Sequence, residues 1–266
     1  MPVSEKGARS RLFLLALAAL AWQPAHAAAC EPLPVLHAAH VRYVIDGDTV
    51  ILSDGEHLRI VGLNAPEIGH DGAADQPYAD AARQRLEDLV GATHGEVKWA
   101  PAADRRDDYG RTLGYLYVGG RDAAAVLLRA GLAALIAIPP NLARVGCYAA
   151  AERAARKAHR GLWSKDSLLL HDAETPAAHA DGFQILRGSI ESVRRLHAGV
   201  RLRLAGGITL WIPAIDEHYF HRDFRDFAGS RVLVRGWLHR YRGNPEIELH
   251  YPAVLTRLDG KLSAGG

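Results

Sequence analysis

The sequence predicts a mainly β chain of the α+β class that is divided into two domains. Short runs of Val, Ile, Leu and Thr alternate with turn residues between residues 39 and 118, which is typical of antiparallel strands. Helical periodicity is concentrated in three segments before residue 160. A second series of short strands begins near residue 183, and a chain of 266 residues is long enough for two domains.

Five strands are expected in the first domain. The first three follow one another closely, and Asp54-Gly55 is a turn signal between the second and the third. A charged loop separates the last two. The expected strands are residues 39–46, 49–53, 57–63, 96–100 and 113–118.

Three helices are expected in the same domain. Residues 78–90 place their apolar side chains on one stripe and end before Gly91. Residues 122–131 begin at an aspartate that suits an N-cap and end at a glycine. Residues 145–159 have an inner face of small residues and a charged outer face.

The second domain, residues 183–260, is expected to form another barrel. Its short strands are joined by turns, and a short helix at 215–227 interrupts the series, a pattern that resembles an OB-fold. The preceding residues 164–182, rich in Ala, His and Asp, are expected to be a linker. The expected strands are residues 185–193, 200–204, 208–212, 231–238 and 246–249.

The N-terminus has the layout of a secretory signal peptide, residues 1–27. Basic residues precede the apolar run Leu12–Trp22, and the small-x-small sequence Ala25-His26-Ala27 follows. The run is shorter than the roughly 20 residues needed to span a bilayer. Cleavage after Ala27 or Ala29 would give a periplasmic or secreted protein with no membrane span. A lipid anchor on Cys30 is the alternative, although Ala27 stands where such signals usually have Leu.

The chain contains two cysteines, Cys30 and Cys147. An even number in an exported protein suggests a disulfide, which would attach the mature N-terminus to the third helix. The alternative is two unpaired thiols.

Charge is distributed unevenly between the two halves. Residues 30–182 carry a net charge of −5 and residues 183–260 a net charge of +4, and every basic residue of the second range is an arginine. An arginine-rich domain suits a polyanionic partner. The chain has 14 histidines, but none has the spacing of a closed zinc site.

Two aspartates stand in an otherwise strand-like stretch, "VIDGDTV" at residues 44–50. Aspartate is disfavoured in strands, so Asp46 and Asp48 need another explanation. One explanation is a hairpin turn at Asp46-Gly47. Another is a site for a hard cation such as Ca²⁺ or Mg²⁺.

Several motifs in a fixed order decide between these explanations: "IDGDTV", "LRIVGLNAPE", "DDYGRTLGYLY", "GLA" and "RGLW". Each is weak alone. Together, over about residues 39–163, they resemble the staphylococcal nuclease-like (thermonuclease) family. The resemblance implies a five-stranded OB-type barrel with three helices, a nuclease-like domain at residues 30–163, and a Ca²⁺-dependent phosphodiesterase site.

The resemblance also implies roles for individual residues. Arg59, Glu67 and Arg111 match the family's catalytic groups: two arginines that contact the phosphate, and a glutamate that activates or orients water. Asp48, Asn64 and the backbone carbonyl of Ala65 match metal ligands, with Asp46 in support. Tyr109 matches a tyrosine beside the phosphate. Arginine suits this chemistry because its planar fork binds phosphate and stays protonated.

The chain departs from the family pattern at two places. Asn64 stands where the family has a second carboxylate ligand, so one negative charge is missing near the cation. The stretch "LIAIPPN" at 135–141 has no Tyr, whereas the family's best-known members have an aromatic pair there that clasps the nucleotide. Base stacking contributes roughly 1–3 kcal/mol per base, so substrate binding must be weaker or come from elsewhere.

In the second domain, arginines alternate with aromatic residues, the composition of a single-strand-binding groove. We expect Arg235, Trp237 and Arg240 to contact nucleic acid. The alternative is a structural barrel in which the aromatic residues form the core and the arginines are solvated. The residues of this pattern are Arg194, Arg195, Arg201, Arg203, Arg235, Arg240, Arg242, Trp211, Trp237 and Tyr241.

The sequence therefore predicts a monomeric, exported, Ca²⁺-dependent endonuclease that acts on DNA and RNA and favours single strands. The alternative is a binding protein that has lost efficient metal binding. The presence of Glu67 favours the enzyme, because a protein that only binds nucleic acid has no need of a group that activates water.

Overall fold

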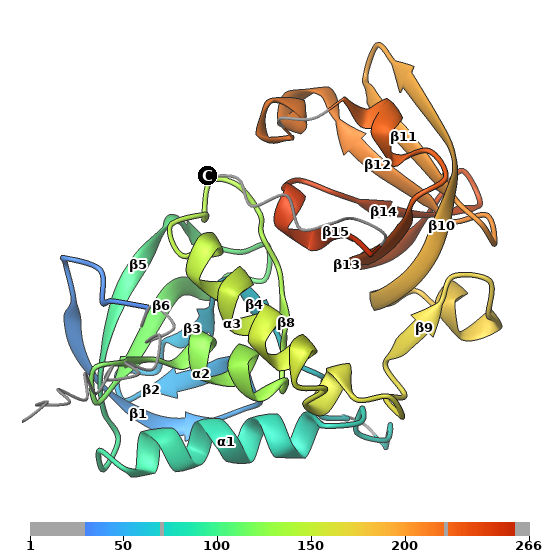
Figure 1. Cartoon of the computed structure of the whole chain (residues 1–266). Helices are drawn as coiled ribbons and strands as arrows, with labels where there is room; N and C mark the ends of the chain where they lie inside the picture. Colours follow the sequence, from blue (N-terminus) through green and yellow to red (C-terminus); the bar gives the residue numbers. More distant parts are fainter. Residues whose placement is uncertain (1–29, 70–71, 221–222, 259–266) are drawn as a thin grey trace, which may run out of the picture.

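A computed structural model describes residues 30–69, 72–220 and 223–258. It contains two β-barrels, and the helices gather around the first one (Figure 1). The predicted fold class, a nuclease-like OB barrel followed by a second OB-like barrel, is confirmed. The expected signal peptide lies outside the described residues. Within them, no helix combines the length and the apolar character that crossing a membrane requires.

The first barrel has the strand order of an OB-fold. Its strands pair in the order β3-β2-β1-β5-β6, and a parallel pairing of β3 with β6 closes the barrel. The edge strand β7 (Arg121–Asp122) pairs antiparallel with β6, and a separate ladder joins β4 (Leu63–Asn64) to β8 (Ala134–Leu135). The barrel strands are β1 (His37–Val44), β2 (Thr49–Leu52), β3 (His57–Ile60), β5 (Glu96–Arg106) and β6 (Thr112–Val118).

One expected strand is divided in the structure. Residues 57–63 were expected to be continuous, but β3 ends at Ile60 and the chain turns at Gly62, whose φ is 86°. Glycine adopts this left-handed conformation without steric cost. The turn frees Leu63 and Asn64 to pair with β8 instead of continuing the barrel.

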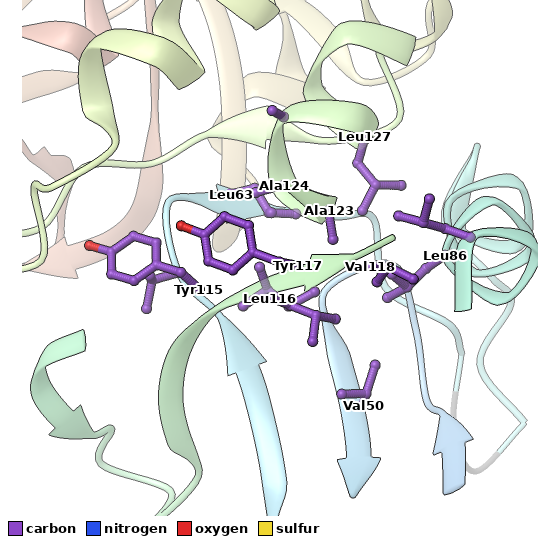
Figure 2. Close-up of a cluster of buried hydrophobic side chains, with 14 of the residues drawn as sticks. Val50, Leu63, Leu86, Tyr115, Leu116, Tyr117, Val118, Ala123, Ala124 and Leu127 are labelled. Atoms are coloured by element: carbon purple, nitrogen blue, oxygen red, sulfur yellow. The ribbon is translucent and has the colours of Figure 1, made fainter. Parts of the chain in front are cut away.

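Three helices pack on this barrel: α1 (Ala79–Gly91), α2 (Ala123–Ala130) and α3 (Val145–Lys157). Their apolar faces meet the inner side chains of the strands in one buried cluster. Figure 2 shows Leu86 of α1 and Leu127 of α2 pointing toward Leu116 and Val118 of β6. The helices therefore cover the barrel through the stripes that the sequence predicts.

The structure pairs Cys30 with Cys147, whose Cα atoms are 5.7 Å apart. The bond joins the first described residue to α3 across 117 residues. In the chain-entropy model, closing so long a loop stabilises the folded state by at most about 5 kcal/mol.

The second barrel repeats the strand order of the first. Its strands pair in the order β10-β11-β12-β14-β13, and the pairing of β13 with β10 closes it. As in the first barrel, the third and fifth strands pair in parallel. The barrel strands are β10 (Gly182–Leu196), β11 (Gly199–Leu204), β12 (Thr209–Pro213), β13 (Arg231–Tyr241) and β14 (Asn244–Glu248).

Short elements surround this barrel. The segment expected as a linker contains β9 (Leu170–Asp172), which pairs in parallel with β10. In place of one helix at 215–227, the described residues contain two 3₁₀ helices, η3 (Ala214–Tyr219) and η4 (Phe224–Phe227). The other short elements of this domain are η2 (Pro176–His179), η5 (Pro252–Val254) and β15 (Leu255–Arg257), while η1 (Gly161–Trp163) follows α3 in the first domain.

The two barrels share a buried contact. An apolar cluster combines residues of β8, α3 and η1 with residues of β10 and β13. An ion pair lies beside it, with Arg235 Nη2 of β13 2.9 Å from Glu152 Oε1 of α3, and both side chains are buried. The cluster consists of Ala134, Ala155, Leu162, Trp163, Ile185 and Leu233.

Asp122 connects α2 to α3 inside the first domain. Its carboxylate accepts hydrogen bonds from the Ala125 amide (3.0 Å), as an N-cap does, and from the Tyr148 hydroxyl (3.0 Å). Burial raises the pKa of Asp122 to about 6 from an ordinary value of 3.8. The folded state thus binds the proton of Asp122 more tightly than the unfolded state does. The contribution of the protonated carboxyl group to the free energy of unfolding is therefore complete below pH 3.8 and is lost as the pH rises through about 6.

We expect Asp122→Asn to remove this pH dependence, because asparagine is neutral throughout the range and can still cap α2. As the pH rises from about 4 to about 7, the unfolding free energy of the variant should increase by roughly 2–3 kcal/mol relative to that of the wild type. Denaturant titrations at several pH values measure the difference. Parallel pH profiles for the two proteins would contradict it.

Candidate active site

The candidate site is built around the turn between β1 and β2. Asp46 Oδ1 accepts a hydrogen bond from the Asp48 amide (2.8 Å), which closes a local turn. Gly47 lies between the two aspartates, and a Cβ atom there would lie 2.6 Å from Ala82 Cβ of α1 and 2.7 Å from Ala65 Cβ. The stretch is therefore a hairpin connection, and its glycine also allows α1 and the segment after β4 to approach closely.

Asp48 is the centre of a buried network. Its Oδ2 lies 2.9 Å from Arg59 Nη1 and accepts a hydrogen bond from the Ala65 amide (2.7 Å), while its Oδ1 accepts one from Thr49 Oγ1 (3.0 Å). Burial raises the pKa of Asp48 to about 7, and the nearby Arg59 partly opposes this rise. The carboxylate depends on a neighbouring cation to stay ionised.

Arg59 joins Asp48 to Asn64. This arginine is only 8% exposed, and its Nη2 donates to Asn64 Oδ1 (3.1 Å) while its Nη1 donates to the Ile60 carbonyl (3.1 Å). Asn64 Nδ2 in turn donates to the Ala65 carbonyl (3.2 Å). The turn, β3 and β4 thus converge at one place.

These residues fit a hard cation by donor type. Asp48, Asn64 and the Ala65 carbonyl offer oxygen atoms only, which is the preference of Ca²⁺ and Mg²⁺. Across the described parts of the chain, no group of three His, Cys, Asp or Glu side chains is arranged to hold a metal. The set therefore depends on an amide and a backbone carbonyl, and a cation there would compete with the contacts of Arg59.

Glu67 lies three residues after Asn64, at the start of the loop that leads to α1. Gln76 holds this loop, because its side chain accepts a hydrogen bond from the Glu67 amide (2.9 Å) and its amide donates to the Glu67 carbonyl (3.0 Å). Glu67 is exposed. Its position next to the network suits a group that reaches solvent water.

Arg111 is placed near Arg59 by strand register. It immediately precedes β6, two residues before Leu113, which pairs with Arg59 of β3. Because alternate residues of a strand share a face, Arg59 and Arg111 are expected on the same side of the sheet. Arg111 donates through Nε to Asp107 Oδ2 (2.7 Å), and its guanidinium lies 5.4 Å from the ring of Tyr109, which is 86% exposed.

Two supporting residues were not singled out from the sequence. Asp107 accepts from both the side chain and the amide of Arg111, so it fixes the loop that carries this arginine. Thr49 donates to Asp48. Both lie within the motifs that carry the family resemblance, but only the fold reveals which atoms they hold.

Of the three second-barrel residues expected to contact nucleic acid, one is buried and two are exposed. Arg235 was expected to contact nucleic acid, but it is 2% exposed and paired with Glu152, so it is a structural residue of the interface. Alternation places its side chain on the outer face of β13, and α3 of the first domain packs against that face at Arg235. Trp237, two residues further on, is 43% exposed and packs edge-on against Phe183. Arg240 is also partly exposed and pairs with Asp181 (3.2 Å).

A groove of about 210 Å³ separates Trp237 from the first domain. Its first-domain wall is the segment 136–138, part of the stretch without tyrosine. Its second-domain wall continues the outer face of β13 beyond Arg235 and includes Trp237, His239, Glu248 and His250. An aromatic residue therefore lies beside this stretch, supplied by the other barrel.

Comparison with known proteins shows which family the first domain resembles. A family described as staphylococcal nuclease homologue matches residues 57–165. Endonuclease YncB of Bacillus subtilis is 32% identical over 125 residues, which cover 46% of this chain and 59% of that protein. Thermonuclease of Staphylococcus intermedius is 32% identical over 128 residues, covering 47% of this chain and 75% of that protein.

A probable endonuclease, LCL3 of Phaeosphaeria nodorum, is 32% identical over 142 residues, covering 50% of this chain and 46% of that protein. The chain thus spans about half the length of several relatives, whereas it covers three quarters of the thermonuclease. The matched family ends at residue 165, before the second barrel. On its sequence motifs, its OB-type barrel and these similarities, the chain belongs to the family of staphylococcal nuclease homologues.

Proposed function

We propose that the chain is an exported, Ca²⁺-dependent endonuclease that hydrolyses phosphodiester bonds of DNA and RNA. The observation that carries the proposal is the network of Asp48, Arg59 and Asn64, which gathers oxygen ligands and a phosphate-binding guanidinium at one edge of the barrel. The relatives named endonuclease and thermonuclease support the same chemistry.

In this mechanism each residue has a distinct task. Glu67 accepts the proton of the attacking water, and Arg59 and Arg111 donate hydrogen bonds to the phosphate oxygens as negative charge builds up on them. Tyr109 lines the phosphate position. A bound Ca²⁺, held by Asp48, Asn64 and the Ala65 carbonyl with support from Asp46, would supply positive charge beside the phosphate.

Arg59 and Arg111 must change partners when substrate binds. In the described arrangement their guanidinium groups are held by Asp48 and Asp107. A phosphate offers both arginines a bidentate partner of similar geometry. The two aspartates therefore keep the arginines positioned until a substrate arrives.

Export is part of the proposal. It is supported by the signal-peptide pattern and by the Cys30–Cys147 pair, since disulfides persist in oxidising compartments. The direct test of the whole proposal is nuclease activity on single-stranded DNA and RNA with added Ca²⁺, measured again in EDTA. Binding of nucleic acid without Ca²⁺-dependent cleavage would favour the alternative of a binding protein.

We expect Glu67→Gln and Arg111→Ala each to lower kcat at least about 10²-fold, the scale for losing a general base or a charge-stabilising donor. Arg105→Ala is the matched control, because Arg105 is an exposed arginine near the end of β5, the strand that leads into the loop carrying Arg111. Initial-rate kinetics on a short oligonucleotide, with circular dichroism to verify folding, measure the effect. Rates within tenfold of the wild type in folded variants would remove these residues from the mechanism.

We expect Asn64→Asp to strengthen Ca²⁺ binding, because it restores a full negative charge among the oxygen ligands. An effect of roughly 1–2 kcal/mol would lower the dissociation constant about 5- to 30-fold. Isothermal titration calorimetry measures it independently of activity. Asn141→Asp adds the same charge elsewhere and should leave Ca²⁺ affinity unchanged. Equal affinities for wild type and Asn64→Asp would show that this position is not a ligand.

We also propose that the second barrel contributes substrate affinity through Trp237, which lines the groove, and through Arg240 near the end of the same strand. Trp237→Ala should weaken binding of single-stranded oligonucleotides by about 5- to 150-fold, the equivalent of roughly 1–3 kcal/mol for one stacked base. Trp237→Phe should retain most of the affinity. Leu168→Ala, which shortens another exposed apolar side chain, is the control. Unchanged affinity of Trp237→Ala in fluorescence anisotropy would leave the second barrel without this role.

A further inference from the structure

We propose that Arg235 of the second barrel is a positioning residue for the candidate active site of the first barrel. It acts through Glu152 of α3 and through β8. The inference rests on the proposed nuclease function for its effect on turnover, but the structural coupling itself is open to a separate test.

The first link is the ion pair between the barrels. Arg235 Nη2 lies 2.9 Å from Glu152 Oε1, and each side chain is 1% exposed. Arg235 also donates to the Ala253 carbonyl (2.7 Å), which fixes the guanidinium within its own barrel. Glu152 is therefore held by a group that belongs to the other domain.

The second link runs from Glu152 to the site. Its other carboxylate oxygen, Oε2, accepts a hydrogen bond from the Leu135 amide of β8 (2.7 Å). In the β4–β8 ladder, Leu135 pairs with Leu63 and Ala134 pairs with Asn64. One carboxylate thus connects Arg235 to the strand that lies against the residue expected to bind the cation.

Packing supports the same route. Ala134, the partner of Asn64, is fully buried in the apolar cluster that Ile185 and Leu233 of the second barrel complete. The side of β8 that carries Ala134 therefore faces a cluster to which both barrels contribute. Removing or shifting the second barrel would open this cluster beside the strand that pairs with Asn64.

Stability alone does not explain the ion pair. A buried ion pair is often no more stable than an apolar pair of the same volume. In the described structure the Nε and Nη1 atoms of Arg235 are buried without a hydrogen-bond partner, which adds a further cost. What the pair offers over an apolar contact is direction, since Glu152 must present one oxygen to Arg235 and the other to Leu135.

Three variants of the full chain test the inference: Arg235→Met, Glu152→Gln and the double variant. We expect Arg235→Met to lower kcat about tenfold, the kind of loss that a small misplacement of catalytic groups produces, with KM on a short substrate changed less than about twofold. Since both residues act through one route, the double variant should lose no more kcat than the more damaging single variant. Arg187→Met is the control, an arginine of the same barrel that pairs with Asp172 instead.

A purely structural role predicts different results. Variants that are folded at the assay temperature would then keep a wild-type kcat, or their losses would multiply in the double variant, and either result would overturn the inference. If Arg235→Met does not fold, Glu152→Gln carries the comparison, because it removes the ion pair with Arg235 while leaving the arginine in place. A folded Gln variant with unchanged kcat and unchanged amide exchange would overturn the inference in the same way.

Amide hydrogen exchange separates this inference from the proposed function. In the Met variant, or in Glu152→Gln if that carries the comparison, the amides of Leu135 and Ala65 should exchange at least about tenfold faster than in the wild type and in Arg187→Met. Unchanged protection of both amides in a folded variant overturns the coupling. If the wild type cleaves no nucleic acid, the proposed function fails, and the exchange data still decide whether the second barrel supports this strand.

Discussion

The candidate site depends on Asp48, a carboxylate whose removal from water is unfavourable. Asp48 is 3% exposed, and its desolvation raises its pKa to about 7. It is compensated by the Arg59 guanidinium, the Ala65 amide and the Thr49 hydroxyl, which come from three different parts of the barrel. Because each partner must reach the same carboxylate, their positions are tightly constrained, and the arrangement that stabilises Asp48 also assembles the site.

Glu152 of α3 is held in a similar arrangement. It is also a buried carboxylate, and it bonds an arginine and a backbone amide just as Asp48 does. Between the two lies the short β4–β8 ladder, whose residue Asn64 contacts Arg59 on one side while Leu135 contacts Glu152 on the other. Of the two arginines near Glu152 Oε1, Arg235 lies closer (2.9 Å) than Arg156 of the same helix (3.7 Å), so the inferred route to the site begins in the second barrel.

Much of the fold follows from local sequence. The strands and three helices of the first domain lie close to their expected positions, because their apolar periodicity matches the element that forms. The limits of local reasoning appear where tertiary contacts decide. Leu63 and Asn64 look like the end of a strand, but they pair with residues 134–135, far along the chain. The strand β9 could not be distinguished from a linker, because its three residues depend on long-range contacts, the pairing with β10 and the packing of Leu170 against the cluster between the barrels.

The site is similarly divided into predictable and unpredictable parts. Asp48, Arg59 and Asn64 were identified by motif, and the structure brings them together. The role of Arg235 could not be identified from composition, because an arginine in an arginine-rich strand looks like a surface residue. Its partner Glu152 stands on the charged face of a helix, where solvation is the usual expectation. Only the packing of the two barrels removes both from water.

The same packing changes how the basic charge of the second domain is interpreted. Its net charge of +4 suggests a broad surface for polyanions, but several of its arginines are already paired within the described structure. Arg235 is neutralised by Glu152, Arg187 by Asp172 and Arg195 by Glu217. An arginine that is already paired with a carboxylate gives less to a phosphate, because the existing pair must first be broken. Affinity for nucleic acid in this barrel should therefore depend more on exposed aromatic surface beside the groove than on the count of arginines, and such binding would be less sensitive to salt than the composition suggests.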